Sequence, residues 1–335
     1  EQYPKITVVM VSGASHANAD IVVECLNSGA FDFVTKPLES DIDHSKGALS
    51  ASLKPILTLL ARRGKYARPA SSPVRVQAPQ SSPGVDGDGT VVASRESGRP
   101  SSFVGGRGLA GSSAGVKAPV SSYASGRAGG VRSGDRPSGP VWESKPALLL
   151  IGSSTGGPAA LTQLLSGISP GLGIPAMIVQ HMPPMFTLSL AAQLTRATGH
   201  VVQEAEHNRM LEAGRIFLAP GGRHLSVKKQ GDGLRTVLND GPKVNGCRPS
   251  VDVLFMSVLA SFSEPVLAVI LTGMGNDGAN GVKGLKRSGR TYCITQSKES
   301  CVVYGMPRVV EEMGLSDASL TLEQMGARIT ELCRS

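Results

Sequence analysis

The segment that most restricts the fold is a strand-like run followed at once by a glycine-rich turn and a helix-like stretch. Residues 147–151 read ALLLI, residues 152–158 read GSSTGGP, and residues 159–165 read AALTQLL. A continuous aliphatic run is typical of a strand that is buried on both faces, as in a parallel sheet. The small residues allow a sharp turn, and Pro158 suits the first turn of a helix. The pattern therefore predicts a strand–turn–helix unit of an α/β protein.

The same alternation continues towards the end of the chain. Further strand-like runs are AMIVQ, RIFLA, PVLAVIL and TYCIT, and helix-like stretches separate them. This predicts a doubly wound, mainly parallel sheet with helices on both faces, a three-layer αβα domain over residues 146–335. The segment HLSVKKQGDGLRTVLND predicts a short antiparallel hairpin with its turn at residues 231–233.

Two regions precede this domain. Residues 1–64 follow the pattern strand, helix, strand, helix, which predicts part of a parallel α/β unit. A segment of this size buries too little apolar surface to be stable on its own. Residues 65–145 hold 14 Gly, 16 Ser and 8 Pro in 81 positions, which predicts a disordered linker. The same stretch has 11 Lys and Arg against 5 Asp and Glu, so it carries +6 of the formal net charge of +8. Because the four aromatic residues of this stretch, Tyr66, Phe103, Tyr123 and Trp142, are too widely spaced for a stacking platform, we expect a solvated linker and no nucleic-acid partner.

Composition excludes several other classes of protein. With 335 residues, 40% hydrophobic and 18% charged, the chain is long and apolar enough for a sizeable core. No apolar run approaches the roughly 18 residues that cross a bilayer, so we expect no membrane insertion. The five cysteines are odd in number and include no C-x-x-C pair, which argues against a disulfide framework or a zinc site. We therefore expect a cytoplasmic protein that needs no metal and no cofactor.

The glycine-rich turn contains the pattern G-x-S-x-G, formed by Gly152, Ser154 and Gly156. Between a strand and a helix this pattern is typical of a nucleophile elbow, which exposes the serine hydroxyl. Free N–H groups at the helix start can also hold an oxyanion. A phosphate-binding loop or a plain tight turn remains an alternative interpretation, because a short glycine motif is weak evidence on its own.

A serine nucleophile requires a base and a group that orients the base. His181 ends the apolar run AMIVQ, and Asp277 lies in the loop MGNDGANG after the run PVLAVIL. Ser154, His181 and Asp277 thus each follow a separate predicted parallel strand, so all three should meet at one edge of the sheet. A hydroxyl, an imidazole and a carboxylate together predict a catalytic triad. Taken individually, a histidine at a strand end such as His181 is more often an ordinary surface or capping group, and Asp277 fits an ordinary turn or helix cap.

Six segments occur in a fixed order between residues 146 and 333: IGSSTGGP, QHMP, GRIFLAPGGRHL, RPSVDVLF, LTGMGNDGANG and VVYGMPR. In these segments the chain resembles the catalytic domain of bacterial chemotaxis protein-glutamate methylesterases. The resemblance implies that Ser154 is the nucleophile, His181 the general base and Asp277 its orienting partner. It further implies that Met274 and the backbone near Thr155 form the oxyanion site.

The resemblance also implies a function. Members of this family remove methyl groups from glutamate esters on the cytoplasmic helices of chemoreceptors, release methanol, and deamidate particular receptor glutamines. The implied partners are methyl-accepting chemoreceptors as substrate and, in intact members, the chemotaxis histidine kinase.

Near the amino terminus, VVMVSGASHANADIVVECLNSGAFDFVTKP resembles the second half of a receiver domain, as found in response regulators. Ser12 falls at the switch hydroxyl position and Lys36 at the phosphate-contacting lysine. The phosphoacceptor aspartate belongs to the first half, so we assign none in this chain. We expect an activity that does not respond to a phosphodonor.

Three alternatives stay open at this point. A triad defines the reaction but not the acyl donor, so the chain could be a serine esterase for a different ester. A non-catalytic phosphate or nucleotide module would use residues 152–157 alone, although these residues lack the Lys-Ser/Thr ending of a P-loop. A nucleic-acid binder acting through residues 65–145 would show a steep salt dependence.

Overall fold

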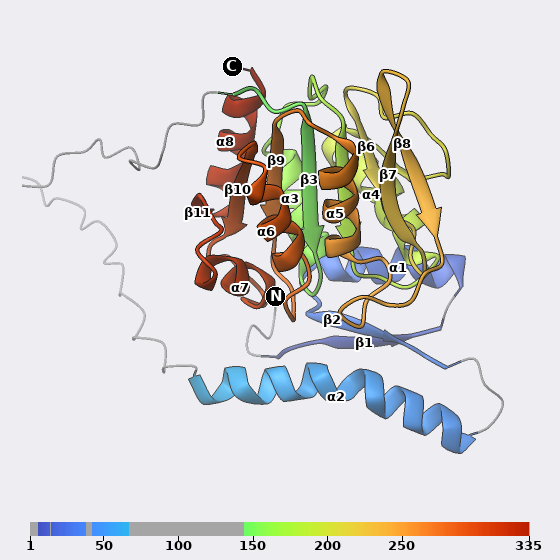
Figure 1. The fold of residues 1–335 in the computed structure, drawn as a ribbon. Coiled ribbons are helices and arrows are strands. Elements are labelled where there is room, and N and C mark those ends of the chain that lie inside the picture. The colour runs from blue at the N-terminus through green and yellow to red at the C-terminus, as the bar shows by residue number, and fades with distance from the viewer. Residues whose placement is uncertain (1–5, 14, 38–41, 67–143, 335) are drawn as a thin grey trace, which may run out of the picture. The chain divides into compact units, whose positions relative to one another are not determined.

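The computed structural model describes residues 6–13, 15–37, 42–66 and 144–334 (Figure 1). These residues belong to one compact unit. The predicted linker over 65–145 lies almost wholly outside the described residues, so its disorder stays a prediction. None of the described helices is both long enough and apolar enough to span a bilayer.

A seven-stranded sheet forms the centre of the carboxyl-terminal part. Its strand order is β11-β10-β9-β3-β4-β6-β5, and every neighbouring pair is parallel. The doubly wound α/β fold expected from the sequence is therefore confirmed. The strands are β3 (Leu148–Ser153), β4 (Ala176–Gln180), β5 (Val201–Glu204), β6 (Arg215–Leu218), β9 (Val266–Ile270), β10 (Thr291–Gln296) and β11 (Ala318–Leu320).

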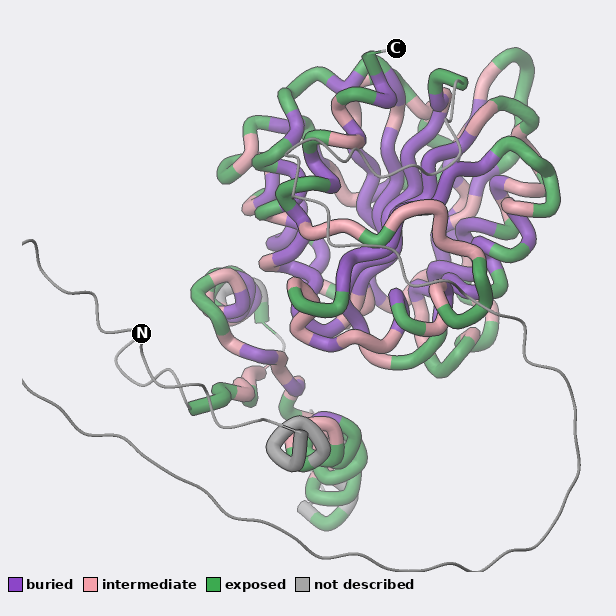
Figure 2. Tube along the Cα trace, turned by 90° about the vertical axis from the view of Figure 1, so that its left-hand side faces the viewer, coloured by how far each residue is buried: buried purple, intermediate pink, exposed green. Residues whose placement is uncertain are grey.

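Helices cover both faces of this sheet. Because successive side chains of a strand point to opposite faces, Leu149 and Ile151 of β3 lie in one hydrophobic core, and Leu148 and Leu150 lie in the other. Figure 2 shows the buried residues gathered in the interior of this part of the chain, and every residue of β3, β4, β9 and β10 is buried. Helices α3 (Gly157–Ser166), α4 (Phe186–Thr198) and α8 (Leu322–Arg334) line the first core, and α5 (Val251–Ser261), α6 (Ala279–Arg287) and α7 (Met306–Glu312) line the second.

The predicted hairpin is present beside the sheet. Strands β7 (His224–Gln230) and β8 (Gly233–Asn239) pair in antiparallel fashion around a turn in which Gly231 has φ +60°. The hairpin packs on α5, where the Ser257 hydroxyl accepts the N–H of Val227 at 2.9 Å.

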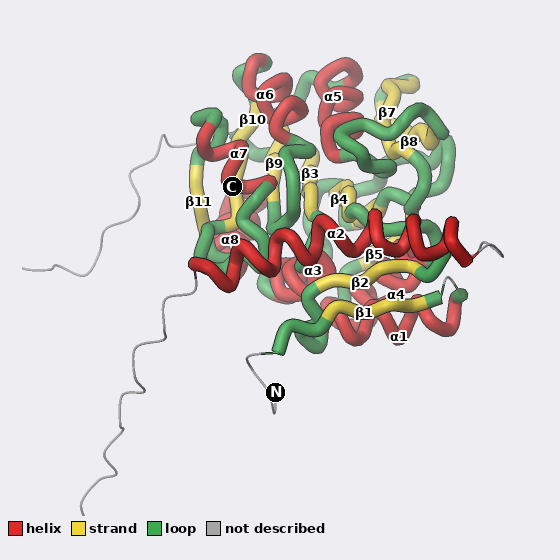
Figure 3. The backbone as a smooth tube through the Cα atoms, turned by 90° about the horizontal axis from the view of Figure 1, so that it is seen from below, coloured by secondary structure: helices red, strands yellow, loops and turns green. Residues whose placement is uncertain are grey.

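The amino-terminal segment follows the expected order of strand, helix, strand, helix. It comprises β1 (Val9–Ser12), α1 (His16–Asn27), β2 (Asp32–Thr35) and α2 (Ile42–Tyr66). Strands β1 and β2 pair in parallel and lie side by side in Figure 3. Helix α1 buries its apolar side chains in the same core as α3 and α4, and the Phe33 ring lies 4.6 Å from that of Phe186, centroid to centroid. The assignment of this segment to a receiver domain stays a prediction.

The topology defines where a site can form. Strands β4, β5 and β6 follow β3 in the chain and lie on one side of it within the sheet. Strands β9, β10 and β11 come later in the chain and lie on the other side of β3. The boundary between β3 and β9 is thus a topological switch point. Ligands of open α/β sheets bind at the carboxyl ends of the strands at such a point.

Candidate active site

The structure brings the three predicted residues of the triad to one edge of the sheet. Ser154 follows β3, His181 follows the adjacent strand β4, and Asp277 lies in the loop after β9 on the other side of β3. The Ser154 N–H donates to the carbonyl of Thr272 at 3.0 Å, and the His181 N–H donates to that of Ser153 at 3.1 Å. Backbone hydrogen bonds between the ends of three neighbouring strands therefore fix the backbone positions of Ser154 and His181.

Gln180 ties the ends of β3 and β4 together. The Oε1 atom of its side chain accepts the Ser153 hydroxyl at 2.6 Å, and the Nε2 atom donates to the backbone carbonyl of Ser154 at 2.9 Å. A Cβ atom on Gly157 would lie 1.9 Å from this Gln180 oxygen. A side chain at residue 157 would therefore displace the amide that positions Ser154.

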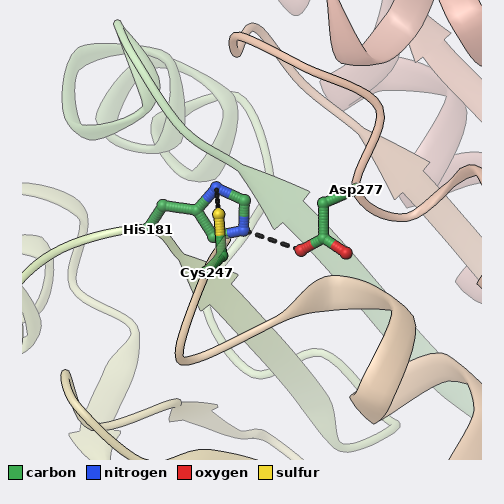
Figure 4. A group of neighbouring side chains, drawn as sticks. All are labelled: His181, Cys247 and Asp277. Atoms are coloured by element: carbon green, nitrogen blue, oxygen red, sulfur yellow. Dashed lines mark hydrogen bonds and ion pairs between the residues drawn. The ribbon is translucent and has the colours of Figure 1, made fainter. Parts of the chain in front are cut away.

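His181 and Asp277 form a hydrogen-bonded pair (Figure 4). Nε2 of His181 lies 2.8 Å from Oδ2 of Asp277, and the side chains are 11% and 2% exposed, respectively. Because the carboxylate accepts the Nε2 proton, the neutral ring carries its lone pair on Nδ1. The arrangement therefore presents Nδ1 as the basic atom.

The Asp277 carboxylate lies at the amino terminus of α5. It accepts the backbone N–H of Val251 at 2.6 Å and that of Asp252 at 3.2 Å. A helix amino terminus is favourable for an anion, since its N–H groups lack partners within the helix. Two side chains complete the set, the hydroxyl of Ser250 and the amide of Asn245, each at 2.8 Å.

These contacts set the protonation of the pair. Burial lowers the pKa of His181, but hydrogen bonds with Asp277 and Cys247 outweigh it and raise the pKa to about 9. Burial raises the pKa of Asp277, but the hydrogen bond and charge of His181, with the donors Asn245 and Val251, lower it to about 2. The resting pair at neutral pH is thus an imidazolium and a carboxylate.

Ser154 does not hydrogen-bond to His181 in this arrangement of the described residues. Nδ1 of His181 instead faces the sulfur of Cys247, 3.5 Å away, as Figure 4 shows. Catalytic hydrogen bonds are often long or unmade before substrate binds, so the geometry leaves the proton transfer possible once the site is filled.

The two residues expected at the oxyanion site also lie at this edge. Thr155 is buried, its carbonyl accepts the Thr272 hydroxyl at 3.0 Å, and its own hydroxyl donates to Asp32 at 2.6 Å. Met274 follows Gly273, which exchanges backbone hydrogen bonds of 2.9–3.0 Å with residues 303 and 306. Neither the Thr155 nor the Met274 N–H donates to any residue that the structure describes.

Sequence reasoning missed several residues of the site. Gln180, Asn245, Cys247 and Ser250 contact the triad, yet none is a typical catalytic residue. Ser250 could have been found from the sequence, because the serine of RPSVDVLF immediately precedes an apolar, helix-like stretch, as N-cap residues do. In the structure Ser250 is the N-cap of α5. Asn245 adopts φ +52°, a backbone conformation that asparagine tolerates better than most residues.

A doubly wound sheet with a serine, an imidazole and a carboxylate at its switch point is the arrangement expected of a serine hydrolase. Comparison with known proteins gives the family. Residues 149–329 match the family model described as CheB methylesterase. The chain belongs to the CheB methylesterase family.

Individual relatives agree with this assignment. A protein-glutamate methylesterase/protein-glutamine glutaminase of Rhodopseudomonas palustris strain HaA2 is 36% identical over 328 residues, 98% of this chain and 75% of the relative. A relative of the same description from Geobacillus kaustophilus is 44% identical over 186 residues, 56% of this chain and 53% of the relative. The crystal structure of the CheB methylesterase catalytic domain of Thermotoga maritima is 37% identical with a TM-score of 0.54, covering 56% of this chain and 98% of that chain. The family expected from the six sequence motifs is thereby confirmed.

Proposed function

We propose that this chain hydrolyses methyl esters of glutamate side chains in proteins and releases methanol, and that it deamidates glutamine side chains by the same route. The family assignment supports both activities, since the relatives are described as methylesterases and glutaminases. The observation that carries the proposal is the 2.8 Å pair of His181 and Asp277 beside the strand end that bears Ser154.

The proposed reaction has two halves. Ser154 Oγ attacks the ester carbonyl while Nδ1 of His181 takes the hydroxyl proton, and Asp277 stabilises the imidazolium that forms. The N–H groups of Thr155 and Met274 hold the oxyanion of the tetrahedral intermediate. His181 then gives its proton to the departing methoxide, which leaves as methanol and an acyl-enzyme. Water, deprotonated by His181, releases the glutamate carboxylate and restores Ser154.

Deamidation follows the same steps with a different leaving group. The amide nitrogen is a poor leaving group, so it must be protonated by the imidazolium as the C–N bond breaks and ammonia departs. The acyl-enzyme is then the same as for the ester, because both substrates yield a glutamyl group on Ser154. One site therefore accounts for both activities.

We infer that the substrates are methyl-accepting chemoreceptors in the cytoplasm, and that the chemotaxis histidine kinase is a partner of longer relatives. The motifs around the site support the receptor assignment. We also infer that the amino-terminal segment is part of a receiver domain attached through a linker. The contact of Asp32 with Thr155 supports a restraint of the site by that segment.

The competing function is an esterase with another substrate. The two are distinguished by comparing methanol release from receptor membranes, carrying methyl-labelled glutamates, with hydrolysis of the small ester p-nitrophenyl acetate. We expect a kcat/KM at least about 100-fold higher for receptor esters, since remote contacts with the helix contribute to transition-state binding. An equal or higher value for the small ester would favour the alternative.

A further inference from the structure

Cys247 contacts the catalytic histidine on the side that has to accept the serine proton. Its sulfur lies 3.5 Å from Nδ1 of His181, while Asp277 holds the opposite ring nitrogen (Figure 4). We propose that Cys247 and His181 bind zinc, or another thiophilic divalent cation, and that the bound ion inhibits the hydrolase.

The separation of the two candidate ligand atoms fits such an ion. Zinc bonds to sulfur at about 2.3 Å and to imidazole nitrogen at about 2.0–2.1 Å in tetrahedral geometry, which puts the two atoms about 3.6 Å apart. The observed 3.5 Å requires almost no movement of either side chain. Both residues are partly accessible, so an ion from solvent can reach them.

Asp277 prepares the ring for this role without binding the ion itself. The ligand atoms of His181, Cys247 and Asp277 all lie within 4.8 Å of one another. The carboxylate already accepts five hydrogen bonds, from the imidazole, two side chains and two backbone N–H groups. Metal-binding histidines commonly donate their other N–H to a carboxylate, which fixes the tautomer and raises the basicity of the ligating nitrogen.

Inhibition follows from the atoms involved. As the ion binds, the thiol of Cys247 and the Nδ1–H of the His181 imidazolium each release a proton to solvent, and the sulfur and Nδ1 lone pairs left behind bond to the ion. Nδ1 then has no lone pair for the Ser154 proton, so attack on the ester stops. With only two protein ligands, water completes the coordination sphere, and we expect reversible binding rather than a structural site.

The sequence alone does not indicate this pair of ligands, because His181 and Cys247 are 66 positions apart in the chain. The expectation that the reaction needs no metal is unaffected, since the proposed ion is an inhibitor. The proposal also does not depend on the identity of the ester, because binding is measured without substrate.

The test is zinc binding by the full chain, measured by competition with a fluorescent zinc indicator and repeated with Co²⁺. We expect one site per chain and a thiolate-to-cobalt charge-transfer band in the near ultraviolet. Cys247→Ser should lose the band and weaken zinc binding at least tenfold. Cys25→Ser replaces another partly buried cysteine, in α1, and should retain both. His181→Gln should weaken binding but keep a folded chain by circular dichroism.

Esterase assays give a second readout. Zinc should inhibit the unmodified chain and Cys25→Ser, and a chelator should restore the rate, while Cys247→Ser, compared with its own metal-free rate, should be at least tenfold less sensitive. Zinc binding that is equal in the unmodified chain and folded Cys247→Ser would overturn the proposal. Binding as expected in a chain without esterase activity would contradict the proposed function alone.

Discussion

Asp277 lies 2.8 Å from Nε2 of His181, so the carboxylate fixes both the orientation of the ring and the nitrogen that carries its proton. The carboxylate is itself held by the amino terminus of α5. The imidazole is therefore positioned through a chain of contacts that begins in the backbone of a helix.

Replacing Asp277 with Asn should lower kcat by about 10³- to 10⁴-fold with little change in KM, because the amide favours the wrong tautomer of His181. The measurement is steady-state methanol release, with circular dichroism to verify folding. Asp232→Asn is the matched control, since Asp232 is exposed in the turn between β7 and β8. A loss below tenfold for Asp277→Asn would show that the carboxylate does not orient the base.

The raised pKa of His181 predicts an alkaline pH profile. The general base must be neutral, and with a pKa of about 9 most of the imidazole is protonated at pH 7. In chelator-containing buffer, kcat/KM should rise about tenfold per pH unit between roughly pH 6.5 and 8. A plateau reached by pH 7.5 would mean that the histidine keeps its ordinary pKa. Spontaneous ester hydrolysis is subtracted at each pH.

Gly157→Ala should damage the site through Gln180. The new Cβ would overlap the Gln180 side-chain oxygen, so the amide must move and release the carbonyl of Ser154. We expect a loss of about 1–3 kcal/mol in the free energy of unfolding, typical of overpacking, together with a fall in kcat. Gly173→Ala, where a Cβ meets no atom within 4 Å, is the control. Equal stability and activity of the two variants would contradict this account of the turn.

Burial raises the pKa of Asp32 and outweighs the hydrogen bonds from Thr155 and the Phe33 N–H. The folded state therefore favours the protonated acid, so the stability from this group is present at low pH and lost as pH rises through the folded pKa. Asp32→Asn should raise the thermal midpoint at pH 7.5, and the difference should shrink towards pH 4. The exposed Asp20→Asn should show no such trend. A lower midpoint for Asp32→Asn at pH 7.5 would contradict the assigned direction.

The sequence predicted much of the central fold. Long aliphatic runs such as those of β3 and β9 are buried on both faces, so their composition identifies them without any knowledge of their neighbours. The edge strands β5 and β11 were missed, because Val201–Glu204 and Ala318–Leu320 are short and partly polar and depend on pairing with the adjacent strand.

The residues of the site that directly follow strands could be predicted from the sequence. Parallel strands bring their carboxyl ends together, so Ser154, His181 and Asp277 could be placed at one edge from their positions in the sequence. Cys247 and Asn245 could not, because they lie in a loop whose path is set by tertiary contacts. The Asn245 amide, for example, is fixed by bonds to both Asp252 and Asp277 at 2.8 Å.

The most direct test of the proposed mechanism is methanol release by Ser154→Ala, measured on methylated receptor membranes without a phosphodonor. Ser166→Ala, an exposed serine at the end of α3, is the matched control. We expect Ser154→Ala to fold normally and to release no methanol above the enzyme-free rate, while Ser166→Ala keeps full activity. Methanol release by folded Ser154→Ala at a rate near that of the unmodified chain would contradict the assignment of Ser154 as the nucleophile.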